Sequence, residues 1–297
     1  MPIPSEGFPL SAAVSPRVHV IETVDSTNAK LLRDAADDPD GHPHLSVVVT
    51  RDQRAGRGRL DRAWTTPPGS ALAVSVLLRV GAVATSDRGW IPLIAGVAMA
   101  DAVAAQLPSM RAGRDVQLKW PNDVLVQGLK ISGILAEVLP TDPHTVVLGA
   151  GVNTTMAKVD LPVPTATSFA ALGATADEDR LLADFLTGLR DGIARLAVDG
   201  SAAVADDVAA HCATLGAKVT VSLPDGTTRQ YSLCGDRWDA HRYRIAVLRE
   251  PGGHWHDYGK LPRAGRKVGH ATPGSPCCGS RSTPRSASVG CSTPPAS

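Results

Sequence analysis

The feature that most constrains the fold of this chain is an apolar run at residues 45–49 that leads directly into a loop rich in arginine and glycine. The run holds three valines and no charged residue, a pattern typical of a buried strand. The loop that follows, residues 51–62 (the arginine loop), contains five arginines together with Gly56 and Gly58. We therefore expect a rigid strand that carries a mobile, positively charged loop at its end.

The arginine loop has the chemistry of an anion-binding site. Glycine lets the backbone approach a ligand closely, and guanidinium groups match the oxygens of carboxylates and phosphates. Loops of this composition also occur as solvated segments or as RNA-binding tracts. Because the whole chain has a formal net charge of only +1, the positive charge is local, which favours an anionic small molecule over a nucleic acid.

Length and composition indicate a globular, cytoplasmic enzyme. With 297 residues, of which 43% are hydrophobic and 20% charged, the chain can bury one sizeable core and hold a small second domain. No signal-peptide pattern opens the sequence, and Asp101 interrupts the apolar stretch at 91–107, which argues against a membrane span. The five cysteines all follow residue 211, which suits neither a disulfide scaffold nor a zinc site.

Strand and helix patterns are mixed along the first 214 residues, which predicts an α/β or α+β sheet domain. Ser26, Thr27 and Asn28 precede an apolar segment and have the character of a helix N-terminus with its cap. We expect strands at 45–49, 70–78, 116–120, 130–139 and 146–151, and helices after Asn28 and at 91–107, 179–198 and 201–214.

The composition changes after residue 214. Residues 217–233 have the pattern of a β-hairpin around a Pro-Asp-Gly turn, and residues 243–248 either add a third strand or leave the hairpin alone. From Tyr258 onward the sequence has no Asp or Glu and is rich in Ser, Pro and Gly, so we expect disorder there. The expected domains are an N-terminal arm (1–17), a catalytic domain (18–214), a small β domain that is incomplete or altered (215–257) and a disordered tail (258–297).

Three predicted strand ends carry polar or small residues that could meet at one ligand. They are Lys-Trp-Pro-Asn-Asp at 119–123, Lys-Ile-Ser-Gly-Ile-Leu-Ala-Glu at 130–137 and Gly-Ala-Gly-Val-Asn at 149–153. Taken singly, such residues are more often core, solvated or turn positions than ligand contacts. Together with the capped helix start and the arginine loop, they predict a single site.

These three motifs and the Gly-Arg-Gly-Arg sequence at 56–59 resemble the motif set of the biotin–protein ligases. The resemblance covers residues 18–233 and is specific, because four motifs occur in the same order. It implies an α+β fold in which helices flank a mixed β-sheet similar to that of class II aminoacyl-tRNA synthetases and lipoate ligases. A small SH3-like β domain is implied after it.

The resemblance also implies roles for individual residues. Lys130 and Arg59 resemble the catalytic residues, and the sequence assigns no metal ligands. The residues that resemble those binding biotin are Ser26, Thr27, Asn28, Gln53, Arg57, Gly58, Arg59, Lys130 and Gly133. The residues that resemble those on the ATP or adenylate side are Arg62, Trp64, Lys119, Asn122 and Asn153.

The implied reaction has two steps. Biotin and ATP, with Mg²⁺ screening the phosphates, form biotinyl-5′-adenylate and pyrophosphate. A lysine on the biotin carboxyl carrier domain of an acyl-CoA or pyruvate carboxylase then accepts the biotin. Lipoate or octanoate transfer on the same fold is the alternative, but it gives no reason for the polar set at Ser26, Thr27, Asn28 and Gln53.

The chain departs from the resemblance at both ends. Only about 17 residues precede the first expected strand, too few for the helix-turn-helix domain of many bacterial members. We therefore expect no DNA partner, no membrane partner, and a monomer or weak dimer. From Cys234 onward the sequence no longer resembles the family and has the look of a shifted reading frame, so an inactive relative with a damaged C-terminal domain is a further alternative.

Overall fold

The computed structural model describes residues 7–59, 62–107, 109–215, 217–222, 228–234, 243–248, 266–271 and 290–292, with the backbone alone described from residue 218 onward. The chain divides into two compact units, Met1–His211 and Cys212–Ser297. This division falls close to the boundary that the sequence predicted after residue 214.

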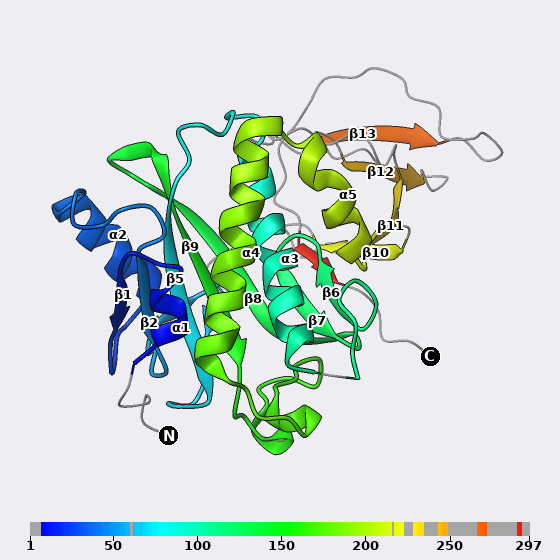
Figure 1. Cartoon of the computed structure of the whole chain (residues 1–297). Coiled ribbons are helices and arrows are strands. Elements are labelled where there is room, and N and C mark those ends of the chain that lie inside the picture. The colour runs from blue at the N-terminus through cyan, green and yellow to red at the C-terminus, as the bar shows by residue number, and fades with distance from the viewer. Residues whose placement is uncertain are drawn as a thin grey trace. The chain divides into compact units, whose positions relative to one another are not determined.

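A seven-stranded sheet forms the centre of the first unit (Figure 1). The β1–β2 pair is parallel and every other neighbouring pair is antiparallel, so the sheet is mixed, as predicted. The strand order is β1 (Val18–Val20), β2 (Val47–Thr50), β5 (Ala71–Arg79), β9 (Asp142–Asn153), β8 (Leu129–Leu139), β7 (Asp123–Val126) and β6 (Val116–Lys119). Two short strands of the arginine-loop region, β3 (Gly56–Arg57) and β4 (Ala63–Trp64), pair separately as a hairpin.

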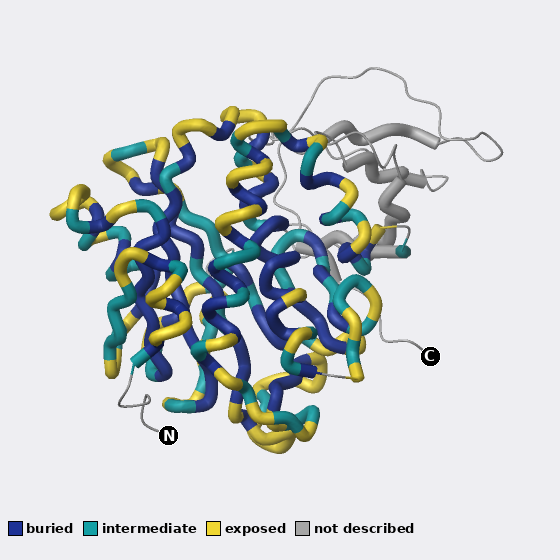
Figure 2. The backbone as a smooth tube through the Cα atoms, viewed as in Figure 1, coloured by how far each residue is buried: buried dark blue, intermediate teal, exposed yellow. Residues whose placement is uncertain are grey.

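Four of the five helices in the described part of the chain lie close to the positions predicted from the sequence; the short helix at residues 9–12 was not predicted. In the view of Figure 1, α3 and α4 run in front of the sheet, and Figure 2 shows the buried residues concentrated along the strands and α3. The helices are α1 (Pro9–Ala12), α2 (Thr27–Asp37), α3 (Ile91–Ala105), α4 (Glu178–Asp199) and α5 (Ala202–His211), with 3-10 turns η2 (Arg88–Trp90), η3 (Lys158–Asp160) and η4 (Ala170–Leu172).

Helix α3 is almost uniformly apolar because it lies inside the unit. The segment Arg88–Ala105 is long and apolar enough to cross a membrane by length and composition alone, yet 67% of it is buried within the structure. A glycine of α4 lets the two helices approach closely, since a Cβ added to Gly192 of α4 would collide with Ile94 of α3. The composition of this helix is therefore explained by core packing.

Alternation along β9 decides which of its side chains face the ligand site. Val147 is buried in an apolar cluster with Leu31 of α2. Because every second residue of a strand points to the same face, Gly149 and Gly151 lie on the α2 face as well. Leu148 points to the opposite face and is fully buried.

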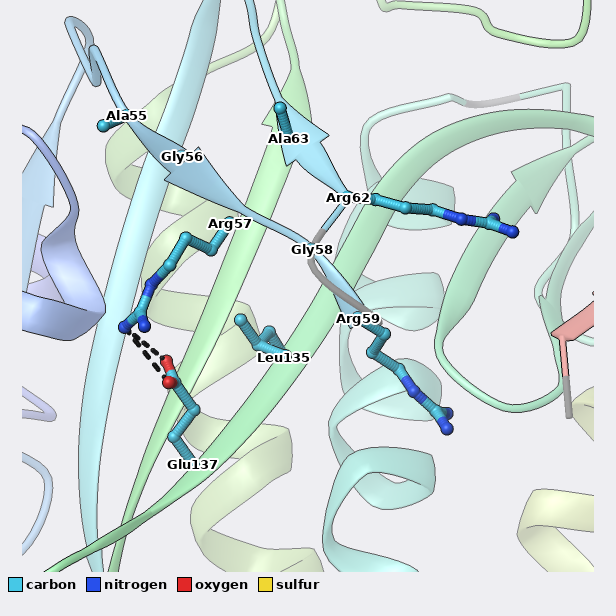
Figure 3. A pocket seen from close by; sticks show the side chains of 9 residues that line it. All are labelled: Ala55, Gly56, Arg57, Gly58, Arg59, Arg62, Ala63, Leu135 and Glu137. Atoms are coloured by element: carbon cyan, nitrogen blue, oxygen red, sulfur yellow. Dashed lines mark hydrogen bonds and ion pairs between the residues drawn. The ribbon is translucent and has the colours of Figure 1, made fainter. Parts of the chain in front are cut away.

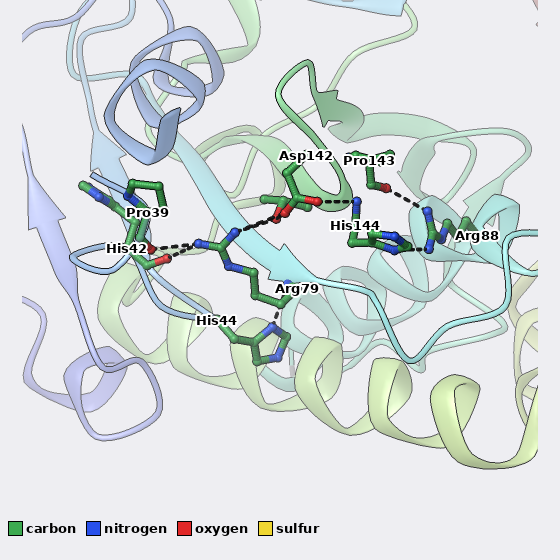
Figure 4. Close-up of polar contacts among 9 residues, drawn as sticks. Pro39, His42, His44, Arg79, Arg88, Asp142, Pro143 and His144 are labelled. Carbon is green, nitrogen blue, oxygen red and sulfur yellow. Dashed lines mark hydrogen bonds and ion pairs between the residues drawn. The ribbon is translucent and has the colours of Figure 1, made fainter. Parts of the chain in front are cut away.

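A polar cluster fixes the segment between α2 and β2 at one end of the sheet (Figure 4). The Arg79 guanidinium donates to Thr145 Oγ1 at 2.6 Å, to the Pro39 carbonyl at 2.9 Å and to the His42 carbonyl at 3.1 Å. Its backbone N–H donates to His44 Nδ1 at 3.0 Å. Burial lowers the pKa of His44, which favours the neutral ring that can accept this bond.

The second unit contains a five-stranded sheet. The predicted hairpin is present as an antiparallel pair of β10 (Lys218–Ser222) and β11 (Thr228–Cys234). Of the two alternatives for residues 243–248, the structure has the third strand, β12 (Tyr243–Leu248), antiparallel to β11. The strand order is β13-β12-β11-β10-β14.

Two strands fall within the segment 258–297 that was expected to be disordered. β13 (Arg266–Ala271) pairs in parallel with β12, and β14 (Gly290–Ser292) pairs antiparallel with β10. The expectation is therefore wrong at these strands, while the rest of the segment lies outside the described residues. The prediction weighed side-chain burial alone, whereas a sheet edge also offers unpaired backbone N–H and C=O groups to any neighbouring segment.

Candidate active site

The start of helix α2 supplies the most buried polar side chains of the site. Ser26 is the N-cap, and its Oγ accepts a hydrogen bond from the Ala29 backbone N–H at 3.3 Å. A serine hydroxyl at this position satisfies one of the free N–H groups of the first turn. Thr27 and Asn28 follow and are both buried, so the sequence prediction of a capped helix start is confirmed.

Gln53, at the start of the arginine loop, is tied to this helix start. Its Oε1 accepts from the Thr27 backbone N–H at 2.8 Å and from Thr27 Oγ1 at 3.0 Å. Its Nε2 lies beside Gly56, where an added Cβ would come within 2.6 Å of it. The structure thus brings together Thr27 and Gln53, which the sequence had grouped as ring-binding residues.

The amide of Asn28 is fixed on both sides. Ser75 Oγ on β5 donates to its Oδ1 at 2.5 Å, and its Nδ2 donates to Glu137 Oε2 on β8 at 2.8 Å. A buried amide with both ends bonded has one orientation. The strands β5 and β8 therefore fix which end of the Asn28 amide donates and which end accepts.

Three glycines of the central strands lie beneath site side chains. Gly133 of β8 lies directly opposite Gly151 of β9. Gly149 comes two residues before Gly151 in β9 and therefore lies on the same face. A Cβ at Gly149 would lie 2.5 Å from Asn28 Oδ1, and one at Gly151 would collide with the Trp64 ring. Because glycine has no side chain, polar and aromatic side chains can lie directly against the sheet at these positions.

Lys130 lies beside the third of these glycines and is held by its backbone. A Cβ at Gly133 would lie 3.2 Å from Lys130 Nζ, which pairs with Asp123 Oδ1 at 2.6 Å. The Lys130 N–H donates to the Thr165 carbonyl at 2.7 Å, and its carbonyl accepts from Thr167 N–H at 2.8 Å. The backbone of Lys130 is therefore held in place, and its ammonium group is paired with a carboxylate.

The arginine loop borders a cavity of about 480 Å³, within the usual range for small-molecule sites. Figure 3 shows Arg57 reaching toward Glu137, while Arg59 and Arg62 extend away from them. The cavity is lined by Ala55, Gly56, Arg57, Gly58, Arg59, Arg62, Ala63, Leu135 and Glu137. Of the residues predicted from the sequence, the structure thus places Arg57, Gly58, Arg59 and Arg62 together.

The charges in this cavity are only partly compensated. Arg57 Nη2 lies 3.0 Å from Glu137 Oε1. Burial lowers the pKa of Arg59, and the nearby charge of Asp123 opposes that shift. Arg62 is exposed. An arginine remains protonated under all such conditions, so three guanidinium groups and one carboxylate line the cavity.

Glu137 is the site residue that sequence reasoning did not single out. It closes the motif at 130–137, and the signal that could have identified it is strand alternation. Leu135 and Glu137 lie two residues apart and therefore on the same face of β8, where both line the cavity. A charged residue on the cavity face of a central strand indicates a contact with the site.

Three residues predicted for the nucleotide side hold the backbone or stand apart from the cavity lining. Asn122 Nδ2 donates to the Ile134 carbonyl at 2.9 Å, and Asn153 Nδ2 donates to the Thr167 carbonyl at 2.9 Å. Lys119 lies opposite Asp123 in the β6–β7 pair. Among the described residues, no group of three or more metal-ligating side chains forms.

Comparison with known proteins identifies the family. Residues 20–153 match the biotin/lipoate A/B protein ligase family. The biotin--[acetyl-CoA-carboxylase] ligase of Mycobacterium tuberculosis is 39% identical over 213 residues, which cover 71% of this chain and 76% of that protein. The chain belongs to the biotin/lipoate protein ligase family. This chain is also 34% identical to the bifunctional ligase/repressor BirA of Escherichia coli, over 48% of this chain and only 42% of that protein.

Solved structures support the same fold. The biotin protein ligase of Aquifex aeolicus in complex with biotin and ATP is 22% identical with a TM-score of 0.60, covering 73% of this ligase and 86% of that chain. The Leishmania major biotin protein ligase in complex with biotin is 25% identical with a TM-score of 0.54, covering 72% and 98% respectively. The predicted helix-flanked mixed sheet is therefore confirmed.

A second match lies outside the catalytic unit. Residues 231–275 match the C-terminal domain of phosphoribosylaminoimidazole carboxylase.

Proposed function

We propose that this ligase joins biotin to ATP as biotinyl-5′-adenylate and then transfers the biotin to a lysine of a carrier domain. The observation that carries the proposal is that two chemically different regions are joined through Glu137, which contacts both Asn28 and Arg57. A fixed, neutral polar set surrounds Thr27 and Asn28, and a set of arginines surrounds Arg57. Biotin has the matching composition, with a neutral ureido ring at one end and a carboxylate at the other.

The neutral end of the site suits a ring that both donates and accepts hydrogen bonds. Ser26, Thr27, Asn28 and Gln53 offer hydroxyl and amide groups at the buried start of α2. A lipoate or octanoate chain offers no N–H or C=O groups at that end to match these hydroxyl and amide groups. This contrast favours biotin over the alternative substrate class.

The cationic end suits the first chemical step. The biotin carboxylate oxygen attacks the α-phosphorus of Mg·ATP, the bond to the β-phosphate oxygen breaks, and pyrophosphate leaves. Lys130, Arg59 and Arg57 offset the repulsion between two anions and stabilise the charge that develops on the phosphoryl oxygens. Holding the reactants in line supplies further acceleration. Arg62, Trp64, Lys119, Asn122 and Asn153 remain the proposed nucleotide-side residues.

In the second step, an acceptor lysine amine attacks the acyl carbon of the adenylate. An amide bond forms, AMP leaves with the electron pair of the anhydride bond, and the amine loses a proton to solvent. The mixed anhydride must be kept from water until then, and we propose that the arginine loop covers it. The proposed acceptor is the biotin carboxyl carrier domain of an acyl-CoA or pyruvate carboxylase in the cytoplasm, where ATP is available.

The experiment that tests this function is mass spectrometry of a carrier domain incubated with the full chain, biotin and Mg·ATP. A biotin adduct on one lysine is the expected result. Parallel reactions with lipoate and octanoate separate the substrate classes, and a carrier domain whose acceptor lysine is replaced by alanine is the control. No adduct with biotin, or a preferred adduct with lipoate, would contradict the proposal.

A further inference from the structure

The cavity contains one acidic side chain that the proposed chemistry does not use. Glu137 shares the cavity lining with Arg57, Arg59 and Arg62. A carboxylate in a site for anions competes with the ligand for the same cations. Its contacts indicate a different role, because they reach both regions of the site.

Glu137 joins the start of α2 to the arginine loop. Its Oε2 accepts from Asn28 Nδ2 at 2.8 Å, and its two oxygens lie 3.0 and 3.1 Å from Arg57 Nη2. The Glu137 side chain is 25% exposed and the Arg57 side chain 49% exposed. A carboxylate on a central strand therefore supports a loop arginine that is itself half open to solvent.

The contact leaves most of the Arg57 guanidinium free for a ligand. A guanidinium carries five N–H donors in a fixed fork, and Glu137 uses Nη2 alone. Among the described residues, Nε and Nη1 take part in no hydrogen bond or ion pair. The direction of the fork is thus set by the ion pair, while its remaining donors can meet an anion.

The contact also sets the Asn28 amide. Ser75 Oγ donates to Asn28 Oδ1, and the Glu137 carboxylate can only accept, so Nδ2 must face it. A neutral ring at this end of the site meets one fixed arrangement of donors and acceptors. Without the Glu137 charge, the amide would lose the stronger of the partners that fix it.

We propose that Glu137 is the positioning residue that aligns the two ends of the biotin site, through Asn28 at the ring end and Arg57 at the carboxylate end. The inference rests on the proposed function, since it takes biotin as the ligand. Glu137 acts through these two residues and does not touch the reacting atoms.

The first test compares E137Q with the wild type. Glutamine keeps the shape and an oxygen acceptor for Asn28 but removes the charge that holds Arg57. We expect the Kd for biotin to rise about tenfold, the size of one lost charge-assisted hydrogen bond. We expect the KM for ATP to change by less than about twofold, because Glu137 bonds to Asn28 and Arg57 and not to the proposed nucleotide-side residues. E22Q is the matched control, since Glu22 is exposed and should behave as the wild type.

A double-mutant cycle tests the pairing itself. If Glu137 acts on biotin largely through Arg57, adding E137Q to R57Q should weaken biotin binding much less than E137Q does alone. Additive effects of the two substitutions would overturn the role of the ion pair. Tighter biotin binding by E137Q would also overturn the proposal, because it would show that Glu137 competes with the ligand.

A readout without any ligand separates this inference from the proposed function. Trypsin should cleave after Arg57 several-fold faster in E137Q than in the wild type or E22Q, at equal melting temperature, because the loop has lost its tether. Equal cleavage rates would overturn the inference even if the wild type is an active ligase. A wild type that forms no biotinyl adenylate would overturn the proposed function whatever the cleavage rates.

Discussion

Thr27, Asn28 and Lys130 (the anchored set) are held by hydrogen bonds to strands or to segments beside them. The start of the arginine loop is anchored by the ion pair of Arg51 with Glu178 and by the bonds of Gln53 to Thr27. From Gly56 onward the loop is held by a hairpin of two short strands and by the ion pair of Arg57 with Glu137. The difference follows from the interactions each region must make. A neutral ring is recognised by the direction of hydrogen bonds, which needs fixed geometry, whereas charge acts over several ångströms and tolerates movement.

The two regions also differ in when their conformational entropy is lost, on folding or on ligand binding. The anchored set is ordered by folding, before any ligand arrives, so these side chains lose little conformational entropy on binding. Arg57, Arg59 and Arg62 carry like charges, so we expect them to order fully only when an anion offsets that charge. We therefore expect the site to bind the ring first and to close over the reacting groups afterwards.

The strongest challenge to the anchored set is Lys130→Ala. If Lys130 stabilises the charge on the phosphoryl oxygens, adenylate formation should slow by about 100-fold or more, while the Kd for biotin changes only a few-fold. Biotin-dependent pyrophosphate release and calorimetry of biotin binding measure the two effects. Lys158→Ala is the control, because Lys158 is exposed on η3. Equal losses in rate and affinity would assign Lys130 to binding instead.

Gly149→Ala tests whether the ring end is as rigid as the hydrogen bonds suggest. The added methyl group would lie 2.5 Å from Asn28 Oδ1, so the amide must turn and lose its bonds. We expect the Kd for biotin to rise about tenfold, equivalent to about 1.4 kcal/mol. Gly81→Ala is the matched control, since the nearest atom to its new methyl is 3.9 Å away. Unchanged affinity would mean that Asn28 can shift without cost.

Ligand-dependent proteolysis tests the loop half of the comparison. Cleavage by trypsin after Arg57, Arg59 and Arg62 should slow several-fold with biotin and Mg·ATP present, because the bound anions relieve the repulsion among the arginines. Cleavage sites elsewhere in the chain provide the internal control. The same rate with and without ligands would show that the loop is already ordered.

Arg59→Ala tests the proposal that the arginine loop covers the adenylate. Without this cation the adenylate should escape more readily, so lysines of a bystander protein such as serum albumin should gain biotin. Mass spectrometry of the bystander, with and without the carrier domain, measures the leak. Arg54→Ala is the control, because Arg54 pairs with Asp52 on the surface and does not line the cavity. Equal bystander labelling by both variants would exclude Arg59 from the cover.

The smallest expected effect belongs to a site apart from both regions. His211, at the end of α5, lies 3.1 Å from Asp101 Oδ1, and a side-chain hydrogen bond to that carboxylate raises its pKa, with the Asp207 backbone contact acting in the same direction. A raised folded pKa stabilises the protein below the unfolded value near 6.5 and loses that effect as the pH rises through the folded value. His211→Gln should therefore lower stability by about 0.5 kcal/mol at pH 6.

The melting temperature measured from pH 5.5 to 9 tests this. The curves of the wild type and His211→Gln should separate at low pH and converge at high pH, with biotin affinity unchanged throughout. A constant offset between the curves would indicate a packing effect without titration. A change in biotin affinity would show that α5 is coupled to the site.

The sequence by itself determined the features that depend on local chemistry. The Ser26 cap, the buried run at 45–49, the apolar helix at 91–107 and the glycine-rich arginine loop are each encoded within a few neighbouring residues. Local preferences and periodicity are strong there because each element carries its own capping group or apolar face. The order of four motifs was enough to predict the family and the mixed sheet.

Only the tertiary structure decided how distant residues meet. The register of β8 against β9 places Gly133 opposite Gly151, and strand alternation carries Glu137 into the cavity between Asn28 and Arg57. Asn122 and Asn153, which the sequence suggested as nucleotide contacts, each donate a side-chain hydrogen bond to the backbone of another segment. Such pairings join residues far apart in the chain, and their choice depends on which strands lie side by side, which no local pattern encodes.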